Sequence, residues 1–301
     1  MSRGIVCAIG GVGVGLKFSV LRHPMPGETL LSSGVSYVNG GKASNQAIGA
    51  AHLGAQARLI STVGDDAFGE MALKILVSHG VGVEGVEVTN QAATMVGALL
   101  VDKNGENEVV VAPGALNTFT ATALTGNRTL IETSDVCLVS LEIPISTARA
   151  ALQIGRESGC LTILNPAPAT NLQETRDLLS LCDIVTPNQS EANFLTGVTN
   201  PEDQAEALLK FGASAVVLTL GARGALVKAR GKSAIFVPAK IVEVLDTSGA
   251  GDGFNAALAV ALLSGDSLER AVARACEAAS LIVQAPAFVE ALHMWADMKW
   301  L

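Results

Sequence analysis

The sequence predicts an α/β fold in which a mostly parallel central sheet carries helices on both faces and a small β-sheet forms a lid. Short apolar runs alternate along the chain with amphipathic or alanine-rich segments, which is typical of repeated βα units. Two hairpin-like or alternating segments interrupt this rhythm in the first half of the chain. A glycine-rich turn then precedes an alanine-rich helix, as in ligand sites at the carboxyl edge of such sheets.

The core elements follow one another from the N-terminus. The predicted strands are short apolar runs at residues 5–9, 57–63, 136–140, 161–164, 183–185, 215–220 and 241–245. The predicted helices are amphipathic or alanine-rich segments at residues 42–53, 67–79, 145–158, 201–211, 250–263 and 267–283. Because strands and helices alternate, we expect parallel pairing within a single domain that spans residues 1–301.

Two stretches that do not suit a parallel core predict the lid. Residues 28–38 alternate between apolar and polar side chains, as a half-exposed strand does. Residues 96–102 and 108–111 flank the pair Asn104-Gly105, which is typical of a tight hairpin turn. We expect a lid inserted from about 14–38 and 94–112 that covers the carboxyl edge of the main sheet. A hairpin without a role in binding is the alternative.

The composition argues against several classes of protein. Apolar residues make up 49% of the 301 residues and the mean hydropathy is +0.42, yet no apolar run approaches the roughly 20 residues of a membrane helix. The net charge of −8, without a Lys or Arg cluster, argues against nucleic-acid binding. Five scattered cysteines and the lack of a signal peptide's apolar core predict a cytoplasmic protein with free thiols.

The most informative motif is the turn Asp-Thr-Ser-Gly-Ala-Gly-Asp at residues 246–252. Its glycines let backbone N–H groups converge on an anion, and the dipole of the following helix adds to the attraction. Asp252 lies in the same turn, where a carboxylate can take the proton of an alcohol that receives a phosphoryl group. Taken alone, the motif is either a phosphoryl-transfer site or a glycine turn with Asp252 as the helix N-cap.

A second motif, Asn-Gly-Gly-Lys-Ala-Ser-Asn-Gln at residues 39–46, opens the first predicted helix. Its paired glycines allow a ligand to approach the backbone closely. Lys42 and Asn45 could donate hydrogen bonds to hydroxyl groups of that ligand. The alternative is an ordinary helix start with a solvated Lys42.

Two further motifs follow predicted strands. In Thr-Pro-Asn-Gln-Ser-Glu at residues 186–191, Glu191 is either close to Mg²⁺ through water or the partner of Asn188 in a capping box. The glycines of Thr-Leu-Gly-Ala-Arg-Gly at residues 219–224 suit a nucleotide that lies against the backbone, or an ordinary turn.

The order of these motifs resembles that of the ribokinase-like (PfkB-type) carbohydrate kinases. The site at 39–46 is followed by Glu142, by Asn-Pro-Ala-Pro at 165–168, and by the motifs at 186–191, 219–224 and 246–252. The resemblance covers nearly the whole chain, and Gly-Gly-Lys and Gly-Ala-Gly-Asp are its most specific parts. It implies a ribokinase-like three-layer sandwich with a β lid, which uses ATP and Mg²⁺ to phosphorylate a sugar hydroxymethyl group.

The resemblance also implies roles for individual residues. Asp252 looks like the catalytic base, and the backbone amides along Gly249, Ala250, Gly251 and Asp252 look like the anion hole. The residues that match sugar contacts are Gly40, Gly41, Lys42, Asn45, Glu142 and Asp252. The residues that match the nucleotide site are Asn188, Thr219, Gly221 and Gly224, with Glu191 in the Mg²⁺ network. Asp246 and Ser248 stand where the family often binds a monovalent cation.

Two departures from the family pattern bear on the substrate and on the cation. The family's first strand usually leads into Asn-x-Asp, which holds sugar hydroxyls, whereas this chain has Gly13 and Gly15. Residues 284–290 replace a Gly-Ala-x-x-Ser loop that completes the cation surroundings. We therefore expect D-ribose to be a poor substrate, and potassium to activate weakly or not at all. Lys17 is either a new donor to the ligand or a solvated strand lysine.

Two other functions stay open at the level of the sequence. A nucleoside kinase of the same fold would need an apolar pocket under the lid, and the glycines at 13 and 15 leave that open. A non-catalytic sugar- or nucleotide-binding relative is disfavoured, because Asp252 and its glycine turn are present. The open edges of the predicted lid make a homodimer through the lid plausible, since pairing would cover them.

Overall fold

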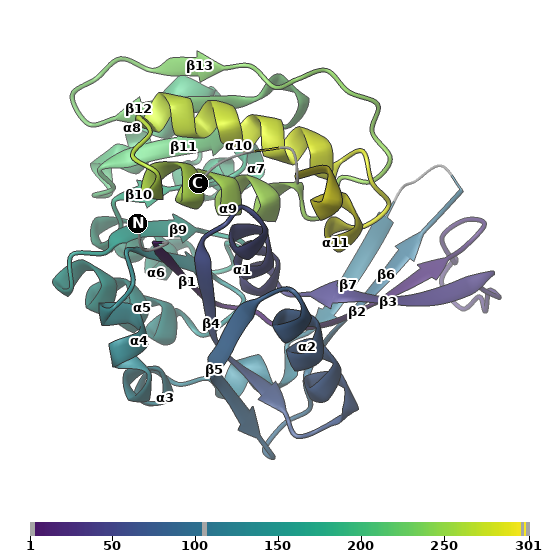
Figure 1. The fold of residues 1–301 in the computed structure, drawn as a ribbon. Helices are drawn as coiled ribbons and strands as arrows, with labels where there is room; N and C mark the ends of the chain where they lie inside the picture. The colour runs from purple at the N-terminus through teal and green to yellow at the C-terminus, as the bar shows by residue number, and fades with distance from the viewer. Residues whose placement is uncertain (1–3, 104–106, 296–297, 299–301) are drawn as a thin grey trace.

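A nine-stranded sheet lies at the centre of the computed structural model, which describes residues 4–103, 107–295 and 298 (Figure 1). In spatial order its strands are β13 (Ile235–Val237), β12 (Ala225–Ala229), β11 (Ala215–Thr219), β10 (Ile184–Val185), β9 (Leu161–Asn165), β8 (Val136–Ser140), β1 (Ile5–Ile9), β4 (Gln56–Gly64) and β5 (Val81–Thr89). Neighbours from β11 to β5 pair in parallel, and β12 and β13 are added antiparallel. Strand β8 is buried at every position, as expected of a strand covered on both faces.

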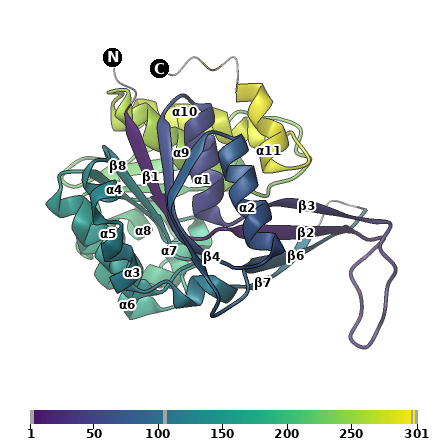
Figure 2. The ribbon, with the colours of Figure 1, turned by 60° about the horizontal axis from the view of Figure 1, so that its bottom comes forward.

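Helices form a layer on each face of this sheet, so the expected three-layer α/β sandwich is confirmed (Figures 1 and 2). One layer holds α1 (Lys42–His52), α2 (Ala67–Ser78), α9 (Ala250–Leu263) and α10 (Leu268–Ile282). The other holds α3 (Ala121–Gly126), α4 (Arg128–Glu132), α5 (Ile145–Glu157), α6 (Leu172–Leu178), α7 (Gln189–Thr196) and α8 (Pro201–Lys210). The short α11 (Phe288–Ala291) follows α10. Within the described ranges, we find no helix with the length and apolar character that a membrane span requires.

A smaller four-stranded sheet projects from one side of the sandwich (Figure 2). Its order is β3 (Gly34–Gly40), β2 (Gly13–Ser19), β6 (Met95–Val101) and β7 (Asn107–Ala112). Strands β6 and β7 form the expected hairpin, although Asn104 and Gly105 of its turn lie outside the described residues. Strand β3 begins only at Gly34 rather than at residue 28, because Gly34 already pairs with Ser19, the last residue of β2.

The strand predicted at residues 241–245 is wrong. The edge of the sheet is formed instead by the antiparallel strands β12 and β13, which follow β11 directly. Residues 241–245 belong to an irregular segment on the surface, in which Ile241, Val244 and Leu245 are exposed. The glycine turn therefore follows a surface segment. Its position at the site is fixed by α9, the buried helix that begins at this turn.

Helices α1 and α9 pack closely, and their N-terminal ends meet at the site. The close approach depends on Gly49 of α1, where a Cβ atom would lie 2.8 Å from the Cβ of Ala256 on α9. The buried Trp295 closes the same contact from the side. Because the packed helices cannot slide without creating voids, residues at their N-terminal ends are held at fixed separations.

Candidate active site

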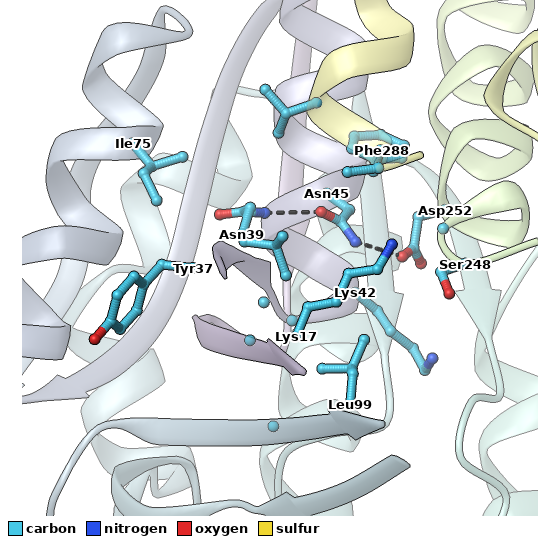
Figure 3. A pocket seen from close by; sticks show the side chains of 18 of the residues that line it. Lys17, Tyr37, Asn39, Lys42, Asn45, Ile75, Leu99, Ser248, Asp252 and Phe288 are labelled. Carbon is cyan, nitrogen blue, oxygen red and sulfur yellow. Dashed lines mark hydrogen bonds between the residues drawn. The ribbon is translucent and has the colours of Figure 1, made fainter. Parts of the chain in front are cut away.

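A cavity of about 440 Å³ lies between the four-stranded sheet β3-β2-β6-β7, which is the lid, and the N-terminal ends of α1 and α9 (Figure 3). This volume is typical of small-molecule sites. The cavity brings together most residues that the sequence assigns to the sugar, the base and the cation: Gly40, Gly41, Lys42, Asn45, Glu142, Asp246, Ser248, Gly249 and Asp252. They come from segments as far apart as β3 and α9, which converge because α1 and α9 pack together.

Asp252 lies in the first turn of α9 and is 8% exposed. The interpretation of Asp252 as an N-cap is wrong, because the cap residue is Gly249, in the left-handed conformation with φ 77°. The first backbone N–H groups of a helix have no carbonyl partner within it, so the amides of Gly251 and Asp252 are available to an anion. The amide of Ala250 makes a long bond, 3.3 Å, to Thr247 O. Among the described residues, a Cβ atom at Gly251 would meet nothing within 4 Å, so the space before this turn is open.

A chain of amide side chains fixes the Asp252 carboxylate (Figure 3). Asn45 Nδ2 donates to Asp252 Oδ2 at 2.8 Å, and Asn45 Oδ1 accepts from Asn39 Nδ2 at 2.8 Å. Gln46 Nε2 lies 3.4 Å from Asp252 Oδ1 and 3.2 Å from Oδ1 of Asn165, the first residue of the Asn-Pro-Ala-Pro motif. The sequence interpretation missed the contact of Gln46 with Asp252; the only sign of it was the place of Gln46 at the end of the 39–46 motif.

Lys42 and Glu142 complete the charged part of the site. Glu142 Oε2 accepts a hydrogen bond from the backbone N–H of Lys42 at 2.6 Å, which ties the start of α1 to the end of β8. The carboxylate of Asp252 has the largest effect on Lys42 and raises the pKa of its ammonium group, so Lys42 is charged. Burial raises the pKa of the Glu142 carboxyl above its ordinary value.

Burial also has the largest effect on Asp252, and it raises the pKa of this carboxyl. The charge of Lys42 and the hydrogen bonds from Asn45 and Gln46 act in the opposite direction. A carboxylate that is desolvated but still paired with a cation is a stronger proton acceptor than one in water. The arrangement is thus suited to removing a proton from a bound hydroxyl group.

The residues assigned to the nucleotide lie outside this cavity, at the ends of β10 and β11. Asn188 and Thr219 are neighbours in a parallel bridge, and Thr219 N donates to Pro187 O at 2.9 Å. Gly221 and Gly224 have φ 59° and 103°, a region that favours glycine. A Cβ atom at Gly221 would meet no atom of the described part of the chain within 4 Å, so its backbone is accessible to a ligand.

Glu191 takes part in the capping box that the sequence offered as one interpretation. Its backbone N–H donates to Asn188 Oδ1 at 2.8 Å, and its Oε2 accepts from Asn188 N at 2.9 Å. Burial raises the pKa of Glu191, and Lys42 and Asp252 are close enough to influence it. The carboxylate therefore caps α7 and also contributes charge to the region of the site.

Asp246 and Ser248 lie beside the cavity, but the position next to them is taken by Lys17 of β2. Lys17 Nζ donates to Asp246 Oδ2 at 3.0 Å and to Pro286 O at 2.7 Å. Asp246 Oδ1 accepts from Ser248 N at 2.8 Å. Lys17 is thus neither a solvated strand lysine nor a free donor, and the residues present do not fit a separate monovalent cation between Asp246 and Pro286.

The inner face of the lid is made of glycines and apolar side chains around Lys17. Alternation along the paired strands places on this face Gly13, Gly15 and Lys17 of β2, Gly40 and Val38 of β3, Met95, Gly97 and Leu99 of β6, and Val111 and Val109 of β7. All of these except Gly13 line the cavity. The lid therefore gives a bound ligand few side-chain hydrogen-bonding groups.

Comparisons with known proteins agree with this arrangement. Residues 5–293 match the pfkB family of carbohydrate kinases. The chain is 35% identical to a ribokinase of Haemophilus influenzae, over 93% of this chain and 92% of the relative, and 36% identical to a ribokinase of Bacillus subtilis, over 92% of each. The structure of Arabidopsis thaliana ribokinase complexed with ribose and ATP superposes with a TM-score of 0.87 at 26% identity and covers 99% of both chains. The chain therefore belongs to the pfkB family of carbohydrate kinases, phosphotransferases that act on an alcohol group of a sugar.

Proposed function

We propose that this chain transfers the γ-phosphoryl group of ATP to the hydroxymethyl group of a sugar that lies in the cavity under the lid. The observation that carries this proposal is Asp252: a buried carboxylate at an open helix N-terminus, at the wall of a cavity of suitable volume. An anion hole and a proton acceptor within one helical turn are what in-line transfer to an alcohol requires.

Some residues around Asp252 bind the sugar, and others act in the transfer step. Lys42, Asn45 and Glu142 offer donors and an acceptor to sugar hydroxyls, and the backbone of Gly40 and Gly41 allows the sugar to approach closely. Asp252 takes the proton of the attacking hydroxyl group. The amides of the turn at 249–252 stabilise the charge on the transferred group.

The residues suited to the nucleotide and Mg²⁺ lie outside the sugar cavity, at the ends of β10 and β11. Asn188, Thr219, Gly221 and Gly224 form a surface of backbone and small side chains at the ends of β10 and β11, which suits the nucleotide. Among the described residues no group of three His, Cys, Asp or Glu side chains could hold a metal, but Mg²⁺ bound by phosphates, water and the charge of Glu191 needs none. When bound, Mg²⁺ would offset the charge on the phosphate groups, and Glu191 would help to hold it through water.

A nucleoside kinase is the second candidate, because the lid face is apolar. Val38, Leu99 and Val109 would suit the face of a base better than a row of hydroxyls. A non-catalytic binding protein is less consistent with the site, since Asp252 is buried at a cost that binding alone does not require.

A coupled assay of ADP release tests the proposal directly. The purified protein with ATP and Mg²⁺ is offered pentoses, deoxypentoses, hexoses and nucleosides. We expect turnover with a sugar, and product analysis should place the phosphate on its hydroxymethyl oxygen. Turnover with nucleosides alone would favour the second candidate, and no turnover with any acceptor would contradict both kinase functions.

The pH dependence of kcat/KM should show the raised pKa of Asp252. The base must be ionised, so activity is lost as the pH falls through a pKa that lies above the ordinary 3.8 of an aspartate. Because the charge of Lys42 lowers the pKa of Asp252, Lys42→Met should move this acid limb to higher pH, in addition to weakening sugar binding. An acid limb that does not move in Lys42→Met would show that another group controls it.

We also propose that two copies of the chain pair through the lid. The outer strands carry exposed apolar side chains, with Val35 of β3 50% and Val110 of β7 74% exposed. Pairing would cover these edges. We expect a dimer in light scattering and a monomer after Val110→Lys, whose side chain points away from the cavity face. A wild-type monomer at micromolar concentration would contradict this expectation.

A further inference from the structure

Lys17 connects the lid to the turn that carries Asp252, across a sequence separation of 229 residues to Asp246. It stands on the cavity face of β2, two residues beyond Gly15 (Figure 3). The side chains of Lys17 and Asp246 are only 18% and 13% exposed. The contact between them is therefore largely removed from solvent, where a charge-assisted hydrogen bond is stronger than at the surface.

The oxygen atoms around the ammonium group are of the kind that bind a metal cation. Asp246 provides a carboxylate oxygen and Pro286 a carbonyl oxygen, and hard cations prefer such ligands. A lysine ammonium group is a compact charge with three donors. Here it satisfies both oxygens and balances the charge of Asp246. An ion from solution would have to displace a group that is attached to the neighbouring strand.

The same contact holds the turn in front of α9. Asp246 accepts from Lys17 with one oxygen and from the backbone of Ser248 with the other. On the opposite side, the N-cap residue Gly249 abuts Phe288, whose ring would lie 2.8 Å from a Cβ atom there. Lys17 also bonds Pro286, two residues before Phe288. The ammonium group thus joins the lid to both segments that fix the anion hole.

We propose that Lys17 is a positioning residue whose ammonium group takes the place of a bound monovalent cation, so that the lid itself orders the turn before Asp252. The inference rests on the proposed transfer at Asp252. It has two consequences: turnover does not need potassium, and the anion hole is ordered only when β2 lies over the cavity. The geometry supports both consequences, since the donor and its two acceptors belong to three separate segments that meet at one point.

The experiment compares wild type, Lys17→Met and Lys17→Arg in tetramethylammonium, sodium and potassium chloride at equal ionic strength. Wild type should have the same kcat in all three salts. Without potassium, Lys17→Met should lose about 10- to 150-fold in kcat, the equivalent of one hydrogen bond to a charged group. Potassium should restore part of this loss, because the removed ammonium group leaves space beside Asp246. Lys17→Arg keeps the charge and should respond to potassium less than Lys17→Met.

A second measurement does not depend on turnover. Without substrates, potassium should raise the Tm of Lys17→Met relative to tetramethylammonium and leave the Tm of wild type unchanged. Lys74→Met is the matched control, because Lys74 is a 73% exposed lysine on α2 that pairs only with Glu70 among the ion pairs described. This variant should behave as wild type in every salt.

Several results would overturn the inference. These are activation of wild type by potassium, a potassium-dependent Tm of wild type, a normal kcat in Lys17→Met, or a loss that no cation relieves. If Lys17→Met does not fold, the wild-type measurements still decide. Failure of the proposed function would look different: wild type would then turn over no acceptor, while the Tm measurement would still test Lys17.

Discussion

Asp252→Asn is expected to lower kcat by about 10²- to 10⁴-fold, the usual contribution of a general base. The amide cannot take the proton of the attacking hydroxyl group. It can still accept the hydrogen bond from Asn45, so the N-terminus of α9 should keep its position. The affinity for ATP should change little, because the backbone amides of the turn are unaltered. Steady-state kinetics and calorimetric titration with ATP measure the two quantities separately.

Asp66→Asn provides the matched control for this loss. Asp66 is a true N-cap, whose Oδ1 accepts from Gly69 N at 2.8 Å at the start of α2. Asparagine is an equally good cap, but its NH2 group cannot accept the bond that Thr94 N donates to Asp66 Oδ2 at 2.7 Å, so the Tm should fall. Neither Asp66 nor Thr94 lines the cavity, so kcat should stay near the wild-type value in this variant. If Asp252→Asn also stayed within a few-fold of wild type, the role of Asp252 as a base would have to be abandoned.

The central strands could be predicted because burial on both faces restricts their composition. Strands β1 (Ile5–Ile9) and β8 (Val136–Ser140) have the predicted bounds, and both are almost entirely buried. The edge beyond β11 could not be predicted in this way. Residues 241–245 are as apolar as a core strand, yet their environment depends on whether β12 and β13 reach the sheet first. The local composition does not reveal which of these segments pairs with β11 at the edge of the sheet.

Within the site, the motifs predicted which segments converge but not how their side chains pair. The residues of 39–46 and 246–252 do meet at one cavity. The bonds from Gln46 to Asp252 and from Lys17 to Asp246 join residues more than 200 positions apart. Each bond depends on how far one element is shifted along another. The packing of α1 on α9 sets this shift for Gln46, and the packing of the lid on the sandwich sets it for Lys17. The sequence around a strand lysine is the same whether its ammonium group donates to water or to a carboxylate.

Gly13 and Gly15 of β2 differ in how much room the structure leaves for a side chain. A Cβ atom at Gly13 would overlap the backbone oxygen of Met95, so this position has no room for a side chain. At Gly15 a Cβ atom would lie 2.7 Å from Cγ2 of Val38, which a modest shift of that side chain could relieve. Gly15 is therefore the position at which a hydroxyl-binding side chain could be restored.

D-Ribose is accordingly expected to be a poor substrate. A charged hydrogen bond contributes about 1.5–3 kcal/mol and a neutral one about 0.5–1.5 kcal/mol, so the loss of one of each at positions 13 and 15 corresponds to roughly 30- to 2,000-fold in affinity. Bound water could recover part of this loss. Acceptors that lack hydroxyls on the lid side should be preferred, because Val38, Leu99 and Val109 offer them apolar contacts. The values of kcat/KM across the acceptor panel measure the preference.

Gly15→Asp should raise kcat/KM for ribose relative to its deoxy analogue, because the new carboxylate can accept hydrogen bonds from hydroxyls only where they exist. Gly97→Asp is the matched control: Gly97 pairs with Gly15 in the sheet, on the same face, and the nearest described atom lies 3.6 Å from its Cβ position. A gain confined to Gly15→Asp means that the position of the carboxylate, rather than charge in the lid, sets the selectivity. If wild type already prefers ribose, with kcat/KM of about 10⁴ M⁻¹s⁻¹ or more, the hydroxyls are held by other groups, and the glycines of β2 do not determine the substrate.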